Sequence, residues 1–154
     1  MPALLIEDAT LLDCTGRDPQ SGMSVLCEDG RIARIAAAGA ITPPDGARRM
    51  DAGGRTLMPG LTDAHVHFGL TNRTESDAPE SYVSYVLKVA ENIRLALDEG
   101  FTTVRDAGGL DPAYALAVAD GQITGPRILP SGSFISQTGG HGDHRPRFDD
   151  RLDD

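Results

Sequence analysis

The order of strand-like and helix-like segments after Pro59 is the feature that most constrains the fold. Three short apolar runs have the length and composition of strands, and two segments with helical spacing of apolar residues separate them. The strand-like runs are residues 60–68, 101–106 and 127–135, and the helical segments are residues 80–98 and 112–119. The order β-α-β-α-β predicts a parallel sheet with right-handed crossovers. Periodicity alone does not distinguish an open sheet from a barrel.

The first 58 residues follow another pattern. Strand-like runs are separated by turn signals, of which Asp29-Gly30 is the strongest. The predicted strands lie in residues 3–13, with a turn near Glu7-Asp8, and in residues 23–28, 31–37 and 55–58, whereas residues 38–54 are predicted to be loop. We therefore expect a small antiparallel β unit in residues 1–58, marginal in stability by itself. Residues 59–154 form the second predicted domain.

Charge and composition exclude several classes of partner. The net charge is −9 and no basic patch is present, which argues against nucleic acid. No apolar run approaches the roughly 20 residues of a membrane span. Cys14 and Cys27 lie in strand-like runs, where we expect two buried free thiols, and this favours a reducing cytoplasm.

The sequence His65-Val66-His67 stands at the predicted carboxyl end of the first strand after Pro59. Residues i and i+2 of a strand project from the same face, so both imidazoles are predicted to reach one metal ion. Asp63 shares that face and is a candidate acceptor beside the ligands. Two ordinary histidines near a strand end remain the alternative. The carboxyl ends of parallel strands are where barrel enzymes place catalytic groups.

The segment from Gly54 to His67, with Pro59-Gly60-Leu61-Thr62-Asp63 before the histidines, resembles the entry segment of the metal-dependent amidohydrolase superfamily. The stretch Glu28-Asp29-Gly30-Arg31-Ile32 is also typical of it. The resemblance implies a (β/α)8 TIM-like barrel, of which residues 59–154 supply the first three strands. It also implies that residues 1–58 are part of a small β-sandwich. His65 and His67 are implied to bind the more buried metal of a centre with one or two divalent ions, zinc first among them.

A second motif, Thr138-Gly139-Gly140-His141-Gly142-Asp143, resembles the prolidase-like group of that superfamily, and so does the run from Phe101 to Gly109. That group cleaves Xaa dipeptides and N-acyl amino acids. The resemblance implies that His141 binds the substrate carboxylate and does not bind the metal. The roles of Asp143 and His144 stay open. Asp106 is expected to order the turn after the second strand.

The resemblance also implies residues that this chain does not contain. A bridging lysine, two further histidines and a general-base aspartate belong to later strands, and the single lysine, Lys88, lies in a predicted helix. We therefore expect catalysis to need the C-terminal part of the barrel, and the isolated chain to be inactive. A homo-oligomer is expected by analogy alone.

Two alternatives remain. One is an amidohydrolase that acts on cyclic amides, imidazolonepropionase-like or dihydroorotase-like. The other is a truncated, non-catalytic piece that serves in assembly. A nucleotide-binding domain is excluded, because no glycine-rich phosphate loop follows a strand. The substrate side chain, the native metal and its count stay open.

Overall fold

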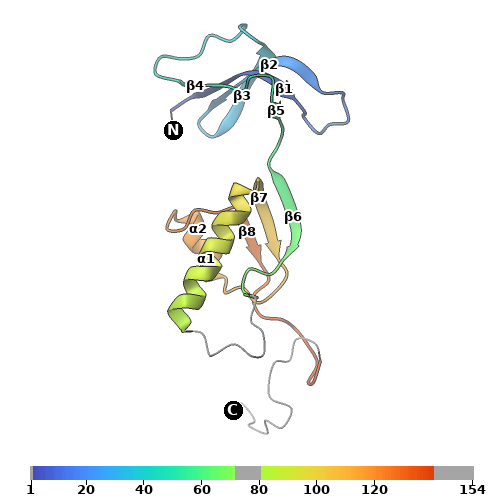
Figure 1. The fold of residues 1–154 in the computed structure, drawn as a ribbon, viewed down its shortest axis with the longest axis vertical. Coiled ribbons are helices and arrows are strands. Elements are labelled where there is room, and N and C mark those ends of the chain that lie inside the picture. Colours follow the sequence, from blue (N-terminus) through green and yellow to red (C-terminus); the bar gives the residue numbers. More distant parts are fainter. Residues whose placement is uncertain (1, 72–80, 141–154) are drawn as a thin grey trace. The chain divides into compact units, whose positions relative to one another are not determined.

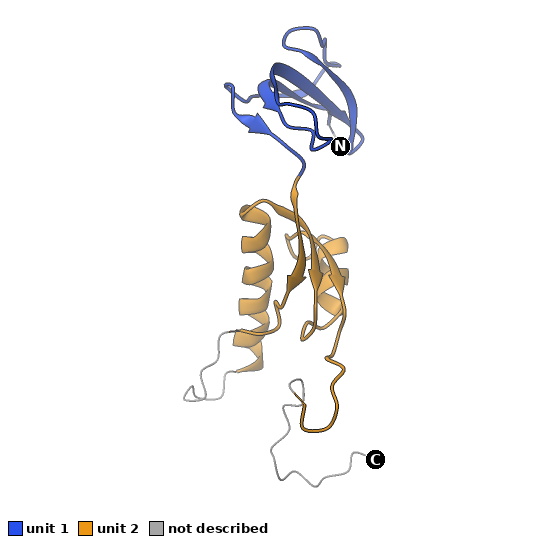
Figure 2. Ribbon diagram, turned by 90° about the vertical axis from the view of Figure 1, so that its right-hand side faces the viewer, with its two compact units in different colours: residues 1–59 blue, residues 60–154 orange. Residues whose placement is uncertain are grey.

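The computed structural model describes residues 2–71 and 81–140. The chain divides into two compact units, Met1–Pro59 and Gly60–Asp154 (Figure 2). The boundary between them lies one residue beyond the boundary expected from the change in sequence pattern. Each unit has a sheet of its own.

The first unit contains one five-stranded sheet with the order β3-β2-β1-β4, in which β5 also pairs with β1. The strands are β1 (Leu4–Leu11), β2 (Gln20–Glu28), β3 (Arg31–Ala37), β4 (Arg48–Asp51) and β5 (Thr56–Leu57) (Figure 1). Leu5, Leu26 and Ile41 form a small buried cluster. Both residues of the turn between β2 and β3 have positive φ, 50° at Asp29 and 73° at Gly30, as the predicted hairpin requires.

The antiparallel prediction is correct for β1, β2 and β3 and wrong for β4 and β5, which run parallel to β1. Strand β4 was expected to be loop, because residues 38–54 are rich in Ala, Gly, Pro and Arg. All four of its residues are exposed, and three of them are charged. The two short strands expected in residues 3–13 are one strand. Asp8, with φ of 51°, lies at an irregularity of pairing instead of at a turn. A second sheet that would complete a sandwich stays a prediction.

The two cysteines differ from the expectation of buried thiols. Cys14 is exposed, in the bend that follows β1, and Cys27 in β2 is half-buried. Cys14 adopts a left-handed φ of 57° and lies three residues beyond the end of β1 at Leu11. Neither cysteine therefore supports an argument about compartment.

The second unit contains a parallel sheet with the order β6-β7-β8, as the alternation of segments predicts. Its elements are β6 (Leu61–Val66), α1 (Tyr82–Asp98), β7 (Phe101–Asp106), α2 (Ala113–Ala119) and β8 (Arg127–Pro130). Both helices lie on the same side of the sheet, and the three strands point the same way (Figure 1). Strand β8 ends at Pro130, five residues before the predicted end. Whether the sheet belongs to a barrel stays a prediction.

The bounds of helix α1 are fixed by residues at its two ends, and its packing is fixed by one buried stripe. The side chain of Ser81 caps its first turn by accepting the amide of Ser84, and Gly100 follows its end with φ of 93°. Val89 and Ile93 are fully buried and pack with Val104 of β7. This cluster fixes the sheet against the helix, so the carboxyl ends of β6 and β7 are held together. Within the part of the chain described, no helix is long and apolar enough to cross a bilayer.

Candidate metal centre

His65 and His67 converge at the carboxyl end of β6. His65 is the penultimate residue of the strand, and His67 follows its last residue. Their Nε2 atoms are 3.1 Å apart, and the rings meet edge to face at 78° with centroids 5.0 Å apart. His65 is exposed and His67 is half-buried. The two imidazoles that the sequence pattern singles out therefore bring their Nε2 atoms within hydrogen-bonding distance of each other.

Strand β6 is irregular just before the two histidines and does not alternate as a regular strand would. Asp63 pairs with Val104 and Val66 pairs with Asp106, so Ala64 and His65 together lie opposite the single residue between those partners in β7. An extra residue of this kind is a β-bulge, which bends the strand and re-aims a side chain. Asp63 was expected to stand beside the ligands on one face. In the structure its Oδ1 accepts the backbone amide of His65 at 3.0 Å, which places the carboxylate beside a candidate ligand.

The tautomer of His67 is set by its second nitrogen. Nδ1 lies 2.9 Å from the carbonyl oxygen of Gly108, and a carbonyl only accepts, so Nδ1–H donates. The neutral ring then keeps its lone pair on Nε2, the atom that faces His65. A metal-binding histidine commonly has this arrangement, with one nitrogen for the ion and the other fixed by a carbonyl or carboxylate.

Asp106 joins the ends of β6 and β7 through backbone amides. Its side chain is fully buried, and its Oδ2 accepts the amide of Phe68 at 2.8 Å while its Oδ1 accepts the amide of Gly108 at 3.0 Å. Phe68 follows His67 in the chain, and Gly108 carries the carbonyl that His67 binds. The carboxylate thus orders the turn after β7, as expected from the sequence. It also fixes that turn to the strand that carries the histidines.

Glycines allow the segments around His67 to approach closely. A Cβ on Gly69 would lie 1.9 Å from the carbonyl oxygen of Gly109, and a Cβ on Gly108 would lie 2.4 Å from the ring of Phe134. Gly108 also has φ of 142°, which side chains rarely tolerate. The Phe134 ring lies 5.6 Å from the imidazole of His67, centroid to centroid. The turn that binds His67 is therefore packed on both sides.

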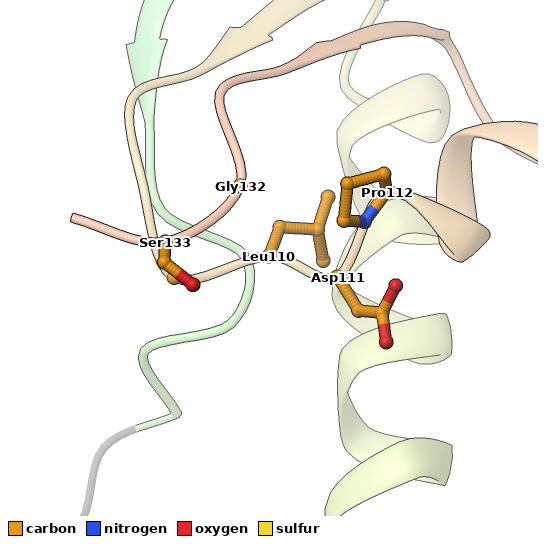
Figure 3. Close-up of a pocket in the computed structure, with 6 residues that line it drawn as sticks. Leu110, Asp111, Pro112, Gly132 and Ser133 are labelled. Atoms are coloured by element: carbon orange, nitrogen blue, oxygen red, sulfur yellow. The ribbon is translucent and has the colours of Figure 1, made fainter. Parts of the chain in front are cut away.

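A pocket of about 370 Å³ lies between the loop after β7 and the segment after β8 (Figure 3). It is lined by Gly109, Leu110, Asp111, Pro112, Gly132 and Ser133. Asp111 uses its Oδ1 to accept the amide of Ala113 at the start of α2, so this oxygen has a structural partner. Neither His65 nor His67 lines this pocket.

The imidazole pair fits a divalent cation. Two nitrogens at 2.0–2.1 Å from a tetrahedral ion lie about 3.3 Å apart, close to the separation of the Nε2 atoms here. Residues 2–71 and 81–140 contain no group of three or more His, Cys, Asp or Glu side chains placed to hold an ion. Further ligands would have to come from outside these residues. His141, Asp143 and His144 also lie outside the residues that the structure describes.

Comparison with known proteins decides the family. The model of the amidohydrolase family matches residues 56–154, which is more than half of the chain. The chain belongs to the amidohydrolase family. The match includes β6, β7 and β8 and both histidines of the candidate centre. The resemblance drawn from the motifs is thereby confirmed at the level of the family.

One curated relative and two solved structures show which members of the family this chain is similar to. Ochratoxinase from Aspergillus niger is 38% identical over 91 residues, which cover 56% of this chain and 19% of that enzyme. A prolidase solved with N-methylphosphonate-L-proline has a TM-score of 0.83 at 34% identity, over 98% of this chain and 36% of its own. A Xaa-Pro dipeptidase with bound methionine in its active site has a TM-score of 0.80 at 31% identity, over 92% and 36%. This chain thus spans about a third of the length of these two solved relatives.

Proposed function

We propose that this chain supplies the first-strand metal ligands, His65 and His67, of a hydrolase that cleaves an amide bond in a dipeptide or an N-acyl amino acid. The observation that carries the proposal is the convergence of the two Nε2 atoms at 3.1 Å. The family match and the likeness to a prolidase and a Xaa-Pro dipeptidase support the reaction class. We propose zinc as the ion, because imidazole suits it, with one or two ions per site.

The residues of this chain have separable tasks in the proposed site. His65 and His67 bind the ion through Nε2. The carbonyl of Gly108 keeps the proton of His67 on Nδ1, so that Nε2 stays available. A bound divalent cation supplies hydroxide at neutral pH and polarises the scissile carbonyl. The general base and the remaining ligands are proposed to come from the C-terminal part of the barrel, and we propose that residues 1–154 alone are inactive.

The proposed binding of the substrate depends on His141. A cationic or hydrogen-bonding imidazole in a glycine-rich segment is suited to hold the carboxylate of the released amino acid. The motif Gly139-Gly140-His141 is followed by Gly142 and Asp143, and this pattern resembles the prolidase-like group. We propose a binding role for His141 and no role in metal binding. A small-molecule substrate, a homo-oligomeric assembly and a cytoplasmic location complete the proposal.

Metal content tests the ligand assignment. In the full-length enzyme, His65→Ala and His67→Ala should each strip the ion, measured by elemental analysis after dialysis against a weak chelator, and activity should fall with it. His141→Ala is the matched control, since it removes an imidazole from the same protein but should keep the metal. A zinc-replete and active His65→Ala variant would refute the assignment.

Substrate panels test the reaction class. Xaa-Pro, Xaa-Arg and N-acyl amino acids should be hydrolysed, and His141→Ala should raise KM for these carboxylate-bearing substrates more than it lowers kcat. Hydrolysis restricted to cyclic amides would favour the ring-opening alternative. An assembled protein that binds no metal and cleaves nothing would favour the assembly alternative.

A further inference from the structure

The bulge in β6 leaves one peptide group, between Ala64 and His65, with side-chain partners on both of its polar atoms. Nε of Arg105 donates to the carbonyl oxygen of Ala64 at 2.7 Å. The amide of His65 donates to Oδ1 of Asp63 at 3.0 Å. The extra residue of a bulge falls out of the regular ladder, and the backbone groups there need other partners. Here a guanidinium and a carboxylate provide them.

Arg105 is well placed to fix this peptide because its own backbone is held in the sheet. It lies in β7, opposite the two bulged residues of β6, and pairs with Leu129 of β8 on its other side. Its guanidinium therefore extends from a strand that has a neighbour on each edge. The contact links that strand to residues 41 positions earlier in the chain.

The orientation of this peptide decides where His65 points. Rotation of the peptide plane turns the Cα–Cβ bond of the next residue, and the Nε2 atom at the far end of the imidazole moves further than the backbone does. His67 is fixed separately, by Gly108 and through Asp106. The two imidazoles thus have independent supports, and only that of His65 depends on Arg105.

We propose that Arg105 is a positioning residue for His65: its guanidinium holds the bulged peptide so that Nε2 of His65 meets Nε2 of His67 at the cation. This inference rests on the proposed metal centre. The proposed role of Arg105 is to orient His65, not to act through its charge. The two roles predict opposite changes in metal affinity when Arg105 is replaced by an uncharged residue. A nearby positive charge repels a divalent cation, so its removal alone would strengthen binding. Loss of positioning weakens binding.

The experiment uses the full-length enzyme with Arg105→Met and Arg105→Lys. Affinity for Zn²⁺ is measured by competition with a chromophoric chelator, and the d–d spectrum of the Co²⁺ form reports ligand geometry. Arg105→Met should weaken Zn²⁺ binding by about 10- to 100-fold, the range typical of residues that orient metal ligands. Arg105→Lys keeps the charge but loses the planar fork, and should weaken binding by less. Both should shift the Co²⁺ spectrum.

Arg127→Met is the matched control, because Arg127 is an exposed arginine at the start of β8, at the other end of the sheet from the histidines. It should leave the affinity for Zn²⁺ and the Co²⁺ spectrum unchanged.

Amide exchange in the metal-free protein gives a second measurement. Exchange of the His65 amide should be faster in Arg105→Met than in wild type or in Arg127→Met, whereas the Val104 amide should not change.

The outcomes separate the two proposals. A wild-type enzyme that binds no stoichiometric cation contradicts the proposed function, and exchange at His65 still tests the support by Arg105. A wild type that binds Zn²⁺ together with an Arg105→Met variant that binds it equally or more tightly overturns the positioning role. If Arg105→Met lowers the melting temperature of the whole chain, the same comparison is made with Arg105→Lys.

Discussion

One carboxylate in each unit joins segments that are distant in sequence, and the two do so in different ways. In the first unit, Glu7 of β1 forms a bidentate pair with Arg49 of β4 at the surface, with distances of 2.8 and 2.7 Å. In the second unit, the side chain of the fully buried Asp106 accepts the backbone amides of Phe68 and Gly108. Both carboxylates join strands that are distant in sequence. Of these two, Asp106 is the one joined to the segments beside the candidate ligands, since Phe68 follows His67 and the carbonyl of Gly108 contacts His67. In this chain the buried carboxylate on main-chain amides, and not the surface ion pair, supports the candidate site.

The largest expected effect comes from Asp106→Ala. Two buried amides would lose a charged acceptor, and hydrogen bonds to charged groups contribute about 1.5–3 kcal/mol each. We expect the free energy of unfolding to fall by roughly 3 kcal/mol or more, measured by urea denaturation of the metal-free chain. Asp51→Ala is the control from the first unit, because exposed Asp51 accepts the amide of Gly53. A similar loss in both variants would remove the contrast between the units.

A smaller effect is expected from Gly108→Ala. The added Cβ would lie 2.4 Å from Phe134 at a φ of 142°. A left-handed or similarly strained conformation costs about 1–2 kcal/mol and overpacking adds about 1–3 kcal/mol. Gly16→Ala in the first unit is the control, since Gly16 has φ of 90° and nothing within 4 Å of the added Cβ. It should show only the backbone cost in thermal melts.

The double variant Gly108→Ala with Phe134→Ala tests whether contact with the Phe134 ring contributes to the loss of stability in Gly108→Ala. Removal of the ring relieves the contact, so the two changes together should destabilise the chain by less than the sum of the single changes. Strict additivity would show that the added methyl group does not meet the Phe134 ring.

The smallest expected effect concerns Glu7. The hydrogen bonds from Arg49 lower the pKa of Glu7 below its usual value of 4.5. A depressed pKa in the folded state means that the pair stabilises the fold above the unfolded pKa, and that this contribution is lost as pH falls through the lower, folded value. Glu7→Gln should therefore reduce the difference in melting temperature between pH 7 and pH 3 slightly. Added salt should weaken the wild-type effect, because the pair is at the surface.

The elements of the fold were predictable where local pattern and tertiary structure agree. Strand β7 occupies the predicted residues 101–106, and β3 the predicted residues 31–37. Strand β4 was missed because pairing with β1, and not its own Arg-Arg-Met-Asp sequence, makes it a strand. Asp8 shows the same limit, since a turn-forming residue lies inside a strand that has partners along both edges.

The candidate site shows a similar division. The spacing of His65 and His67 predicts that they meet, and their Nε2 atoms do. The bulge beside His65 was not predictable, because it depends on how β6 pairs with β7. The support from Gly108 and Arg105 depends on contacts 41 residues away in sequence. Alternation within one strand contains no information about either contact.

The bulge has a consequence for protein engineering. A His-x-His triplet grafted onto a regular strand would place its second-neighbour side chains by alternation, without the extra residue that re-registers β6 against β7. The smallest portable unit is therefore a pair of segments, residues 63–68 and 105–108, carried on two adjacent parallel strands. Transplanting the triplet alone would move the donor atoms but not the scaffold that aligns them.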